Sequence, residues 1–160
     1  MLMPQKITPV LWFDGKAEAA VDHYMSIFAR SKIVTISRFT DIGPGPRDSV
    51  MTITFELEGQ QFVALNGGPQ FKFTEAVSLM VSCDTQAEID MYWEKLGAGG
   101  QHGPCGWLKD KYGLSWQVAP NALFDMILDN DRARANRAMA AMMKMGKMDL
   151  AALRTAYDGR

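Results

Sequence analysis

The alternation of apolar and polar positions predicts the same unit twice along the chain. Apolar runs at 7–13 and 77–83 each predict a strand, and both end in the pattern Asp-x-x-Ala-Glu. Apolar residues then recur at helical spacing over 17–28 and 89–96. Each predicted strand therefore leads into an amphipathic helix that has one face to bury.

Polar residues before the two helices predict how each helix begins. Asp14 can cap the first helix, and Thr85 with Glu88 has the spacing of a capping box. Such side chains accept hydrogen bonds from backbone amides that a helix leaves unpaired. Neither Asp14 nor Asp84 therefore needs a catalytic role.

Three further strands are predicted after each helix. β-Branched residues and alternation indicate them in the first copy, and a turn at Tyr112-Gly113 between two short segments, after a weaker strand, indicates them in the second. The predicted strands are 33–39, 49–57 and 62–66 in the first copy, and 101–105, 107–111 and 114–119 in the second. Each copy has the order β-α-β-β-β, which gives an α+β fold class.

After residue 120 the pattern becomes helical. Apolar residues share a face over 123–127, an alanine- and methionine-rich helix is predicted at 131–145, and a last helix at 149–157 ends before Gly159. The methionines form either an adaptable binding surface or a stripe that packs on the sheet or on a second subunit. We assign them no ligand, since apolar helical stripes usually belong to a core.

Composition limits the partners that we expect. The chain has 160 residues, of which 48% are hydrophobic and 22% charged, as is ordinary for a soluble globular protein. Seventeen basic and eighteen acidic residues leave a net charge of −1, which argues against nucleic acid and anionic membranes as partners. Without a signal peptide or a span of ~20 apolar residues, we expect a cytoplasmic protein.

Few residues suit metal or thiol chemistry. Cys83 and Cys105 lack the spacing of a metal motif, and a reducing compartment keeps them as thiols. His23 and His102 have no acidic partner at ligand spacing, so we interpret them as surface or packing residues. These residues predict no metal site.

Two segments carry a resemblance to a known family. Residues 65–69 read Leu-Asn-Gly-Gly-Pro, and 105–117 read Cys-Gly-Trp-Leu-Lys-Asp-Lys-Tyr-Gly-Leu-Ser-Trp-Gln. With the paired modules, they resemble the PhnB-like branch of the vicinal oxygen chelate superfamily (glyoxalase, bleomycin resistance and dioxygenase proteins). That branch carries the label 3-demethylubiquinone-9 3-methyltransferase domain. Residues 8–15 resemble its opening strand and 142–157 its C-terminal extension.

The resemblance implies paired βαβββ modules that form an incomplete barrel, the glyoxalase/bleomycin resistance/dihydroxybiphenyl dioxygenase fold. It implies a domain at 1–120, with modules at about 5–68 and 75–120, and a C-terminal helical extension at 121–160. It also implies a homodimer.

Metal-dependent relatives bind a divalent ion through residues on the first and last strands of each module. The matching polar residues here are Thr8, Asn66, Ser78 and Gln117. Neutral oxygens are poor ligands for Zn²⁺, Ni²⁺ or Fe²⁺ compared with imidazole and carboxylate. The strand-to-helix junctions also lack the glycine-rich turn with which Rossmann-type methyltransferases bind S-adenosylmethionine. We therefore expect neither a metal nor another cofactor.

The implied cleft holds aromatic and weakly polar side chains: Trp12, Asn66, Cys105, Trp107 and Gln117. Indole rings and amides are typical of small-molecule sites. In the alternative interpretation the tryptophans fill the barrel and the amides tie strand ends together. Cys105 is the one candidate nucleophile, and its activation requires a lowered pKa that sequence does not show.

Two functions are compatible with these features. The first is a metal-free homodimer that binds a small hydrophobic or aromatic molecule. The second is a lyase, dioxygenase or transferase that uses Cys105, Asn66 and Gln117 as polar catalysts. A purely structural dimer is a third possibility, so the sequence leaves open whether the protein is an enzyme.

Overall fold

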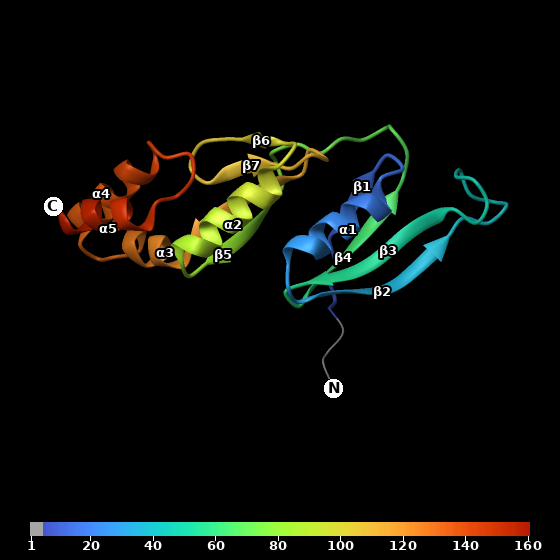
Figure 1. The fold of residues 1–160 in the computed structure, drawn as a ribbon, viewed down its shortest axis with the longest axis horizontal. Helices are drawn as coiled ribbons and strands as arrows, with labels where there is room; N and C mark the ends of the chain where they lie inside the picture. Colours follow the sequence, from blue (N-terminus) through green and yellow to red (C-terminus); the bar gives the residue numbers. More distant parts are fainter. Residues whose placement is uncertain (1–4) are drawn as a thin grey trace. The chain divides into compact units, whose positions relative to one another are not determined.

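The computed structural model describes residues 5–160 and contains two compact units. The first unit ends at Lys72, and the second comprises Phe73–Arg160. Residues 1–4, which the predicted domain includes, lie outside the described residues. Each unit contains one four-stranded sheet, and its elements follow the order β-α-β-β-β along the chain (Figure 1). The predicted α+β fold with repeated βαβββ modules is confirmed.

The first unit has one helix on one face of its sheet. Its elements are β1 (Val10–Phe13), α1 (Ala17–Ile27), β2 (Ser31–Arg38), β3 (Val50–Leu57) and β4 (Gln60–Asn66). The strand order in the sheet is β1-β4-β3-β2, with β1 parallel to β4 and the other pairs antiparallel. The core lies between α1 and the sheet, where Val21, Tyr24 and Phe55 are fully buried.

A two-residue turn joins β3 to β4. Glu58 and Gly59 both have positive φ angles, 49° and 85°, which suit the tight hairpin turn between right-twisted strands. Leu57 and Gln60 are paired directly across it. The turn fixes the register of the two central strands, and the alternation in β3 then puts Ile53, Phe55 and Leu57 into the core.

The second unit repeats this arrangement with shorter strands. Its elements are β5 (Ser78–Cys83), α2 (Gln86–Gly97), β6 (Gln101–His102), β7 (Trp107–Lys109) and β8 (Ser115–Pro120). The strand order is β5-β8-β7-β6, and β5 runs parallel to β8. Helix α2 begins with the predicted capping box: Thr85 accepts from the Glu88 amide, and Glu88 accepts from the Thr85 amide.

Two sequence predictions about this unit and the first helix are wrong in detail. Strands β6 and β7 have two and three residues, because Gly103 and Pro104 form a turn in which the Gly103 amide donates to the Trp107 carbonyl. Asp14 does not cap α1. The residue before that helix is Lys16, which makes no side-chain capping bond, and the cap comes from a strand residue described below.

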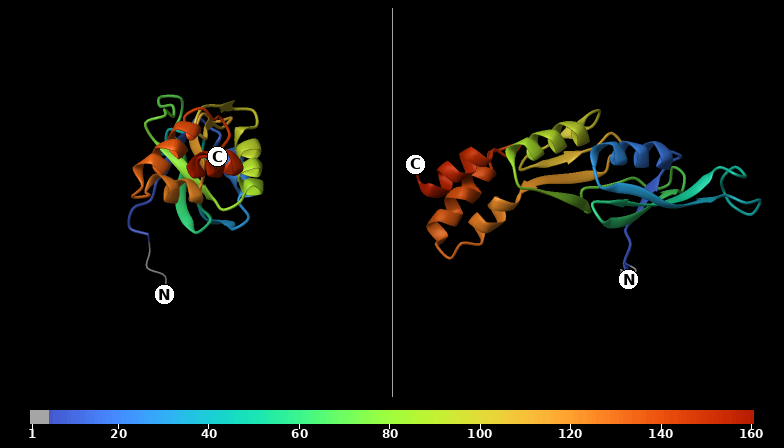
Figure 2. Two further views of the ribbon diagram at one scale, coloured as in Figure 1. Left: turned by 90° about the vertical axis from the view of Figure 1, so that its left-hand side faces the viewer. Right: turned by 60° about the horizontal axis from the view of Figure 1, so that its bottom comes forward.

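Three helices follow β8 and belong to the second compact unit: α3 (Asn121–Ile127), α4 (Arg132–Met142) and α5 (Leu150–Asp158). Figure 2 shows them packed against one another. The Cys105 and Gly106 amides donate to the Met145 and Gly146 carbonyls, which ties the connection between α4 and α5 to the sheet. No helix within the described residues is long and apolar enough to cross a membrane.

Candidate functional site

The open face of the second sheet carries the candidate site. Lys109 is paired with Gln101 on one side and with Ser115 on the other, and Trp107 is paired with Gln117. Directly paired residues point to the same face of a sheet, and successive residues alternate. These side chains therefore face away from α2, on which Leu108 and Trp116 are buried.

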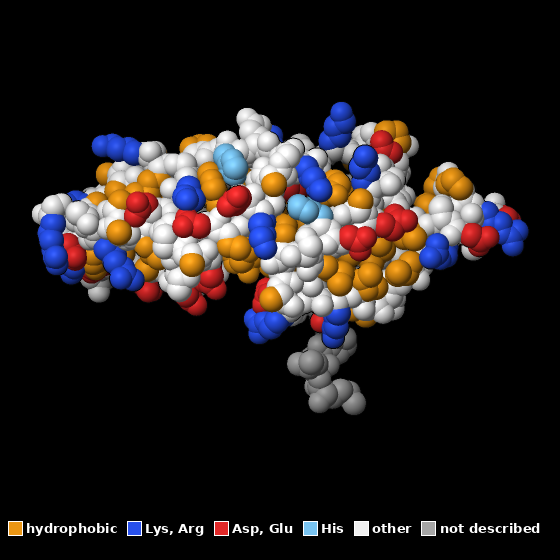
Figure 3. Space-filling model, in the orientation of Figure 1, with side chains coloured by type: hydrophobic (Ala, Val, Ile, Leu, Met, Phe, Trp, Pro, Cys, Tyr) orange, Lys and Arg blue, Asp and Glu red, His pale blue; other side chains and the backbone are white. Residues whose placement is uncertain are grey.

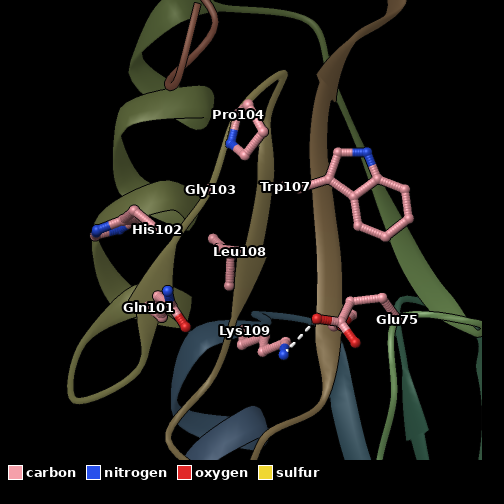
Figure 4. A pocket seen from close by; sticks show the side chains of 9 residues that line it. Glu75, Gln101, His102, Gly103, Pro104, Trp107, Leu108 and Lys109 are labelled. Atoms are coloured by element: carbon pink, nitrogen blue, oxygen red, sulfur yellow. Dashed lines mark ion pairs between the residues drawn. The ribbon is translucent and has the colours of Figure 1, made fainter.

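A cavity of about 450 Å³ opens at this place (Figure 4). Its size is within the range of small-molecule sites, ~300–1,000 Å³. It lies wholly in the second unit and is lined by Glu75, Gln101, His102, Gly103, Pro104, Trp107, Leu108, Lys109 and Ser115.

One ion pair lies at the cavity. The Lys109 ammonium is 2.5 Å from a carboxylate oxygen of Glu75, a residue of the segment before β5. Figure 4 shows this pair and the Trp107 ring on one side of the strands, with His102 on the other. The hydrogen bond from Lys109 holds the pKa of Glu75 below its usual value.

Ser115 is the polar residue at the cavity with an unmet hydrogen-bonding need. It is fully buried, and its Oγ has no hydrogen-bond partner among the described residues. Burying a hydroxyl without a partner costs about 1–3 kcal/mol. A ligand group that enters the cavity and forms a hydrogen bond with this hydroxyl would remove that cost.

Gln117 and Trp107 lie together, as the sequence-derived site requires. They are direct cross-strand partners, and the Gln117 side-chain amide donates to Ser78 Oγ at 2.9 Å. This amide bond joins β8 to β5, so one end of Gln117 has a structural role. The Trp107 ring is half-buried.

Trp12 packs within the first unit. Its Nε1 donates to the Gly68 carbonyl at 2.8 Å, and its ring meets Phe71 edge-on with 4.9 Å between centroids. A Cβ atom at Gly67 would lie 2.4 Å from the indole, so only glycine permits this close approach. The contacts of Trp12 secure the segment that follows β4.

Asn66 lies on the opposite face from Trp12. Trp12 is paired with Leu65, whereas Asn66 is paired with Phe13 on the side covered by α1. Asn66 Oδ1 accepts from the Ala17 amide at 2.9 Å, and its Nδ2 donates to the Val50 carbonyl and to Glu18. The first unit therefore does not bring Trp12 and Asn66 to one cleft wall. Asn66 instead supplies the cap that we expected from Asp14.

The two thiols have different environments. Cys105 lies in the turn before β7 with a φ of 56°, and it is not among the residues that line the cavity. Cys83 is fully buried, and burial, with the nearby charges of Glu88 and Asp84, raises its pKa to about 12. His102, the base nearest to Cys105 in sequence, stacks on Trp93 at 4.5 Å and bonds to its carbonyl. Within residues 5–160, the structure gives the Cys105 thiol no paired base.

Comparison with known proteins identifies the family. Residues 5–119 match the model of the family described as 3-demethylubiquinone-9 3-methyltransferase. The chain belongs to this family. The resemblance to the PhnB-like branch of the vicinal oxygen chelate superfamily is thereby confirmed. None of the curated proteins matches the sequence.

Solved structures agree with this assignment. The chain is 43% identical to a putative 3-demethylubiquinone-9 3-methyltransferase, the PhnB protein, from Bacillus cereus, with a TM-score of 0.65 over 72% of this chain and 99% of that one. A protein from Pseudomonas aeruginosa is 20% identical, with a TM-score of 0.60 and coverage of 72% and 97%. The fosfomycin resistance protein FosX from Mesorhizobium loti is 14% identical, with a TM-score of 0.53 and coverage of 73% and 91%. The last two share the fold alone.

The residues of this family member do not fit the divalent metal that the wider superfamily uses. Among residues 5–160, no group of three or more His, Cys, Asp or Glu side chains is placed to hold a metal ion. Among the corresponding residues, the Asn66 and Gln117 amides bond to protein groups. Ser78 and Thr8, which precedes β1, offer only neutral oxygens. We therefore derive no chemistry through a metal.

The two strand-to-helix junctions also do not match the site with which Rossmann-type methyltransferases bind S-adenosylmethionine. The junction before α2 contains Asp84, whose carboxylate accepts from Asn121, and Thr85, which caps the helix. Neither this junction nor the one at 13–17 is a glycine-rich cradle at a helix start.

Proposed function

We propose that this family member is a binding protein for a small, largely apolar or aromatic molecule, which the cavity on the second sheet holds without a metal. The observation that carries the proposal is the Ser115 hydroxyl at the cavity wall, which is buried and has no hydrogen-bond partner in the described part of the chain. A buried polar group without a partner destabilises the free protein, and a ligand group that bonds to it removes that cost.

The remaining lining residues support the same kind of ligand. Trp107 and Pro104 offer apolar area, and an indole face favours flat rings. Gln101, another lining residue, offers a side-chain amide. The enzymatic alternative receives no comparable support, because Asn66 faces α1 and Cys105 is not among the lining residues.

Removing the hydroxyl tests the proposal. In Ser115→Ala we expect the free protein to become more stable by about 1 kcal/mol, while binding of a ligand found by thermal-shift screening weakens about tenfold. Ser82→Ala, on an exposed residue of β5, is the matched control and should change neither quantity. A variant that loses stability and binds as before would contradict the proposal, as would a stoichiometric transition metal in the purified protein.

The proposal includes a homodimer, located in the cytoplasm as the sequence suggests. Its support is the edge strand β2, where Ile33, Val34 and Ile36 are 41–47% exposed. Figure 3 shows hydrophobic side chains gathered over this part of the first unit. Long exposed apolar edge strands are rare in monomers because they pair with other chains.

Light scattering tests the dimer. Ile36→Lys should shift the protein toward the monomer at micromolar concentration. Ile42→Lys, in an exposed loop, is the matched control and should not. A monomeric native protein would remove this part of the proposal.

A further inference from the structure

Two rows of side chains cross the open face of the second sheet. The first row, from β6 to β5, is Gln101, Lys109, Ser115 and Ser78, each paired with the next. All four side chains can donate hydrogen bonds, and Lys109 adds a positive charge. This row therefore favours an acceptor with negative charge.

The second row lies two residues further along the strands, a distance of about 7 Å. It consists of Trp107, Gln117 and Met80. The indole and the thioether suit a flat apolar group, since both make favourable contacts with rings. The face thus offers a cationic row beside an apolar one.

The anion that now pairs with Lys109 is not part of the sheet. Glu75 belongs to the segment between β4 and β5, and its side chain is 61% exposed. An exposed ion pair contributes little to stability, so a competing anion can replace Glu75 at little cost. Ser115 is the partner of Lys109 on β8, and its hydroxyl has no hydrogen-bond partner among the described residues. It can therefore donate a hydrogen bond to such an anion.

We infer that the ligand class is a small aromatic or apolar carboxylate, with its ring on Trp107 and its carboxylate bonded to Lys109 and Ser115, so that it displaces the Glu75 carboxylate from Lys109. This inference rests on the proposed function. Glu75 then acts as an internal competitor that lowers affinity, and Lys109 determines specificity for anions.

Calorimetric titration with 2-naphthoate and its neutral analogue 2-naphthamide tests the inference on the full chain. We expect naphthoate to bind the native protein more tightly than naphthamide. Lys109→Met should weaken naphthoate binding about tenfold, the value of a hydrogen bond to a charged group. Glu75→Gln should strengthen it about three- to fivefold by removing the competitor. Neither change should alter naphthamide binding.

The controls are Lys111→Met and Glu94→Gln, which alter exposed residues of the same unit and should leave both affinities unchanged. Equal binding of the two probes, unaffected by Lys109→Met, would overturn the anion inference while leaving the apolar cavity of the proposed function intact. Absence of binding by both probes at millimolar concentration would overturn the inference. If the thermal-shift screen also found no ligand, the proposed function would fail with it.

Discussion

The Asp110 carboxylate accepts a hydrogen bond from Trp116 Nε1 at 2.9 Å in the interior of the second unit. Its other oxygen accepts from the Tyr112 and Leu114 amides, which closes the turn between β7 and β8. This turn places Lys109 opposite Ser115. The Asp-Lys-Tyr-Gly segment therefore builds the hairpin that carries the site.

Asp110→Ala should lower the free energy of unfolding by about 3 kcal/mol, because it removes the acceptor of three N–H donors in a site where water does not replace it. Denaturant unfolding measures the loss. Asp125→Ala, on an exposed position of α3, is the control and should stay within about 0.5 kcal/mol of the native protein. A similar small loss in Asp110→Ala would show that the carboxylate does not hold the hairpin.

Asn66 is expected to be structural. Asn66→Ala should lower the free energy of unfolding by about 2 kcal/mol, since the Ala17 amide loses its cap and the Val50 carbonyl its donor. The affinity for any ligand of the second-sheet cavity should not change. Unfolding and calorimetric titration of the same variant measure both quantities. If the variant kept its stability but lost binding, Asn66 would belong to the ligand site and not to the structural contacts alone.

The thiols should differ in reactivity. Because burial raises the pKa of Cys83 to about 12, its reactive thiolate form is scarce near neutral pH. Iodoacetamide at about pH 8 should therefore label Cys105 in the native protein and reach Cys83 only after unfolding. Mass spectrometry of peptides distinguishes the sites, and native Cys105→Ser should remain unlabelled. Rapid labelling of Cys83 in that variant would contradict its burial.

Tyr157 and Asp129 form a hydrogen-bonded pair in the C-terminal helices, with the Arg134 guanidinium over the Tyr157 ring. The hydrogen bond from Tyr157 lowers the pKa of Asp129 and raises that of Tyr157. Because the pKa of Asp129 is lower in the folded protein, the ionised carboxylate stabilises the fold at pH values above the pKa of the unfolded state. This contribution is lost as the pH falls through the folded-state pKa. Because the pKa of Tyr157 is higher in the folded protein, the neutral phenol stabilises the fold at pH values below the pKa of the unfolded state. This contribution is lost as the pH rises through the folded-state pKa.

Tyr157→Phe should therefore melt at a lower temperature than the native protein near neutral pH. The difference should shrink below about pH 4 and above about pH 10, where one partner of the pair changes its charge. Thermal melts across this range provide the measurement. A difference that stayed the same over the whole pH range would show that it does not come from the hydrogen bond between Tyr157 and the Asp129 carboxylate.

Local signals in the sequence were sufficient for much of the fold. The capping box of Thr85 and Glu88 spans four residues, so its outcome depends on nothing distant. The cap of α1 could not be predicted in this way, because Asn66 is 49 residues from the Ala17 amide. Asp14 is a favourable capping residue next to the helix, but the tertiary contact from Asn66 caps the helix instead.

The site was less predictable than the fold for a similar reason. Trp107 and Gln117 were identified by residue type and lie together. Lys109, Gln101 and Ser115 were missed, since each is an ordinary strand residue until the register joins them in one row. The Asp110 to Gly113 turn was the available signal, because it fixes which residues of β7 and β8 are opposite one another.

Nuclear magnetic resonance of the labelled full chain, titrated with 2-naphthoate, locates the bound ligand. If the second-sheet cavity is the binding site, the largest shifts occur at the Trp107 indole and at the Lys109 and Ser115 amides, on the open face of the second sheet. Saturable shifts confined to the first unit, or to Trp93 and the α2 side of the second, would contradict it.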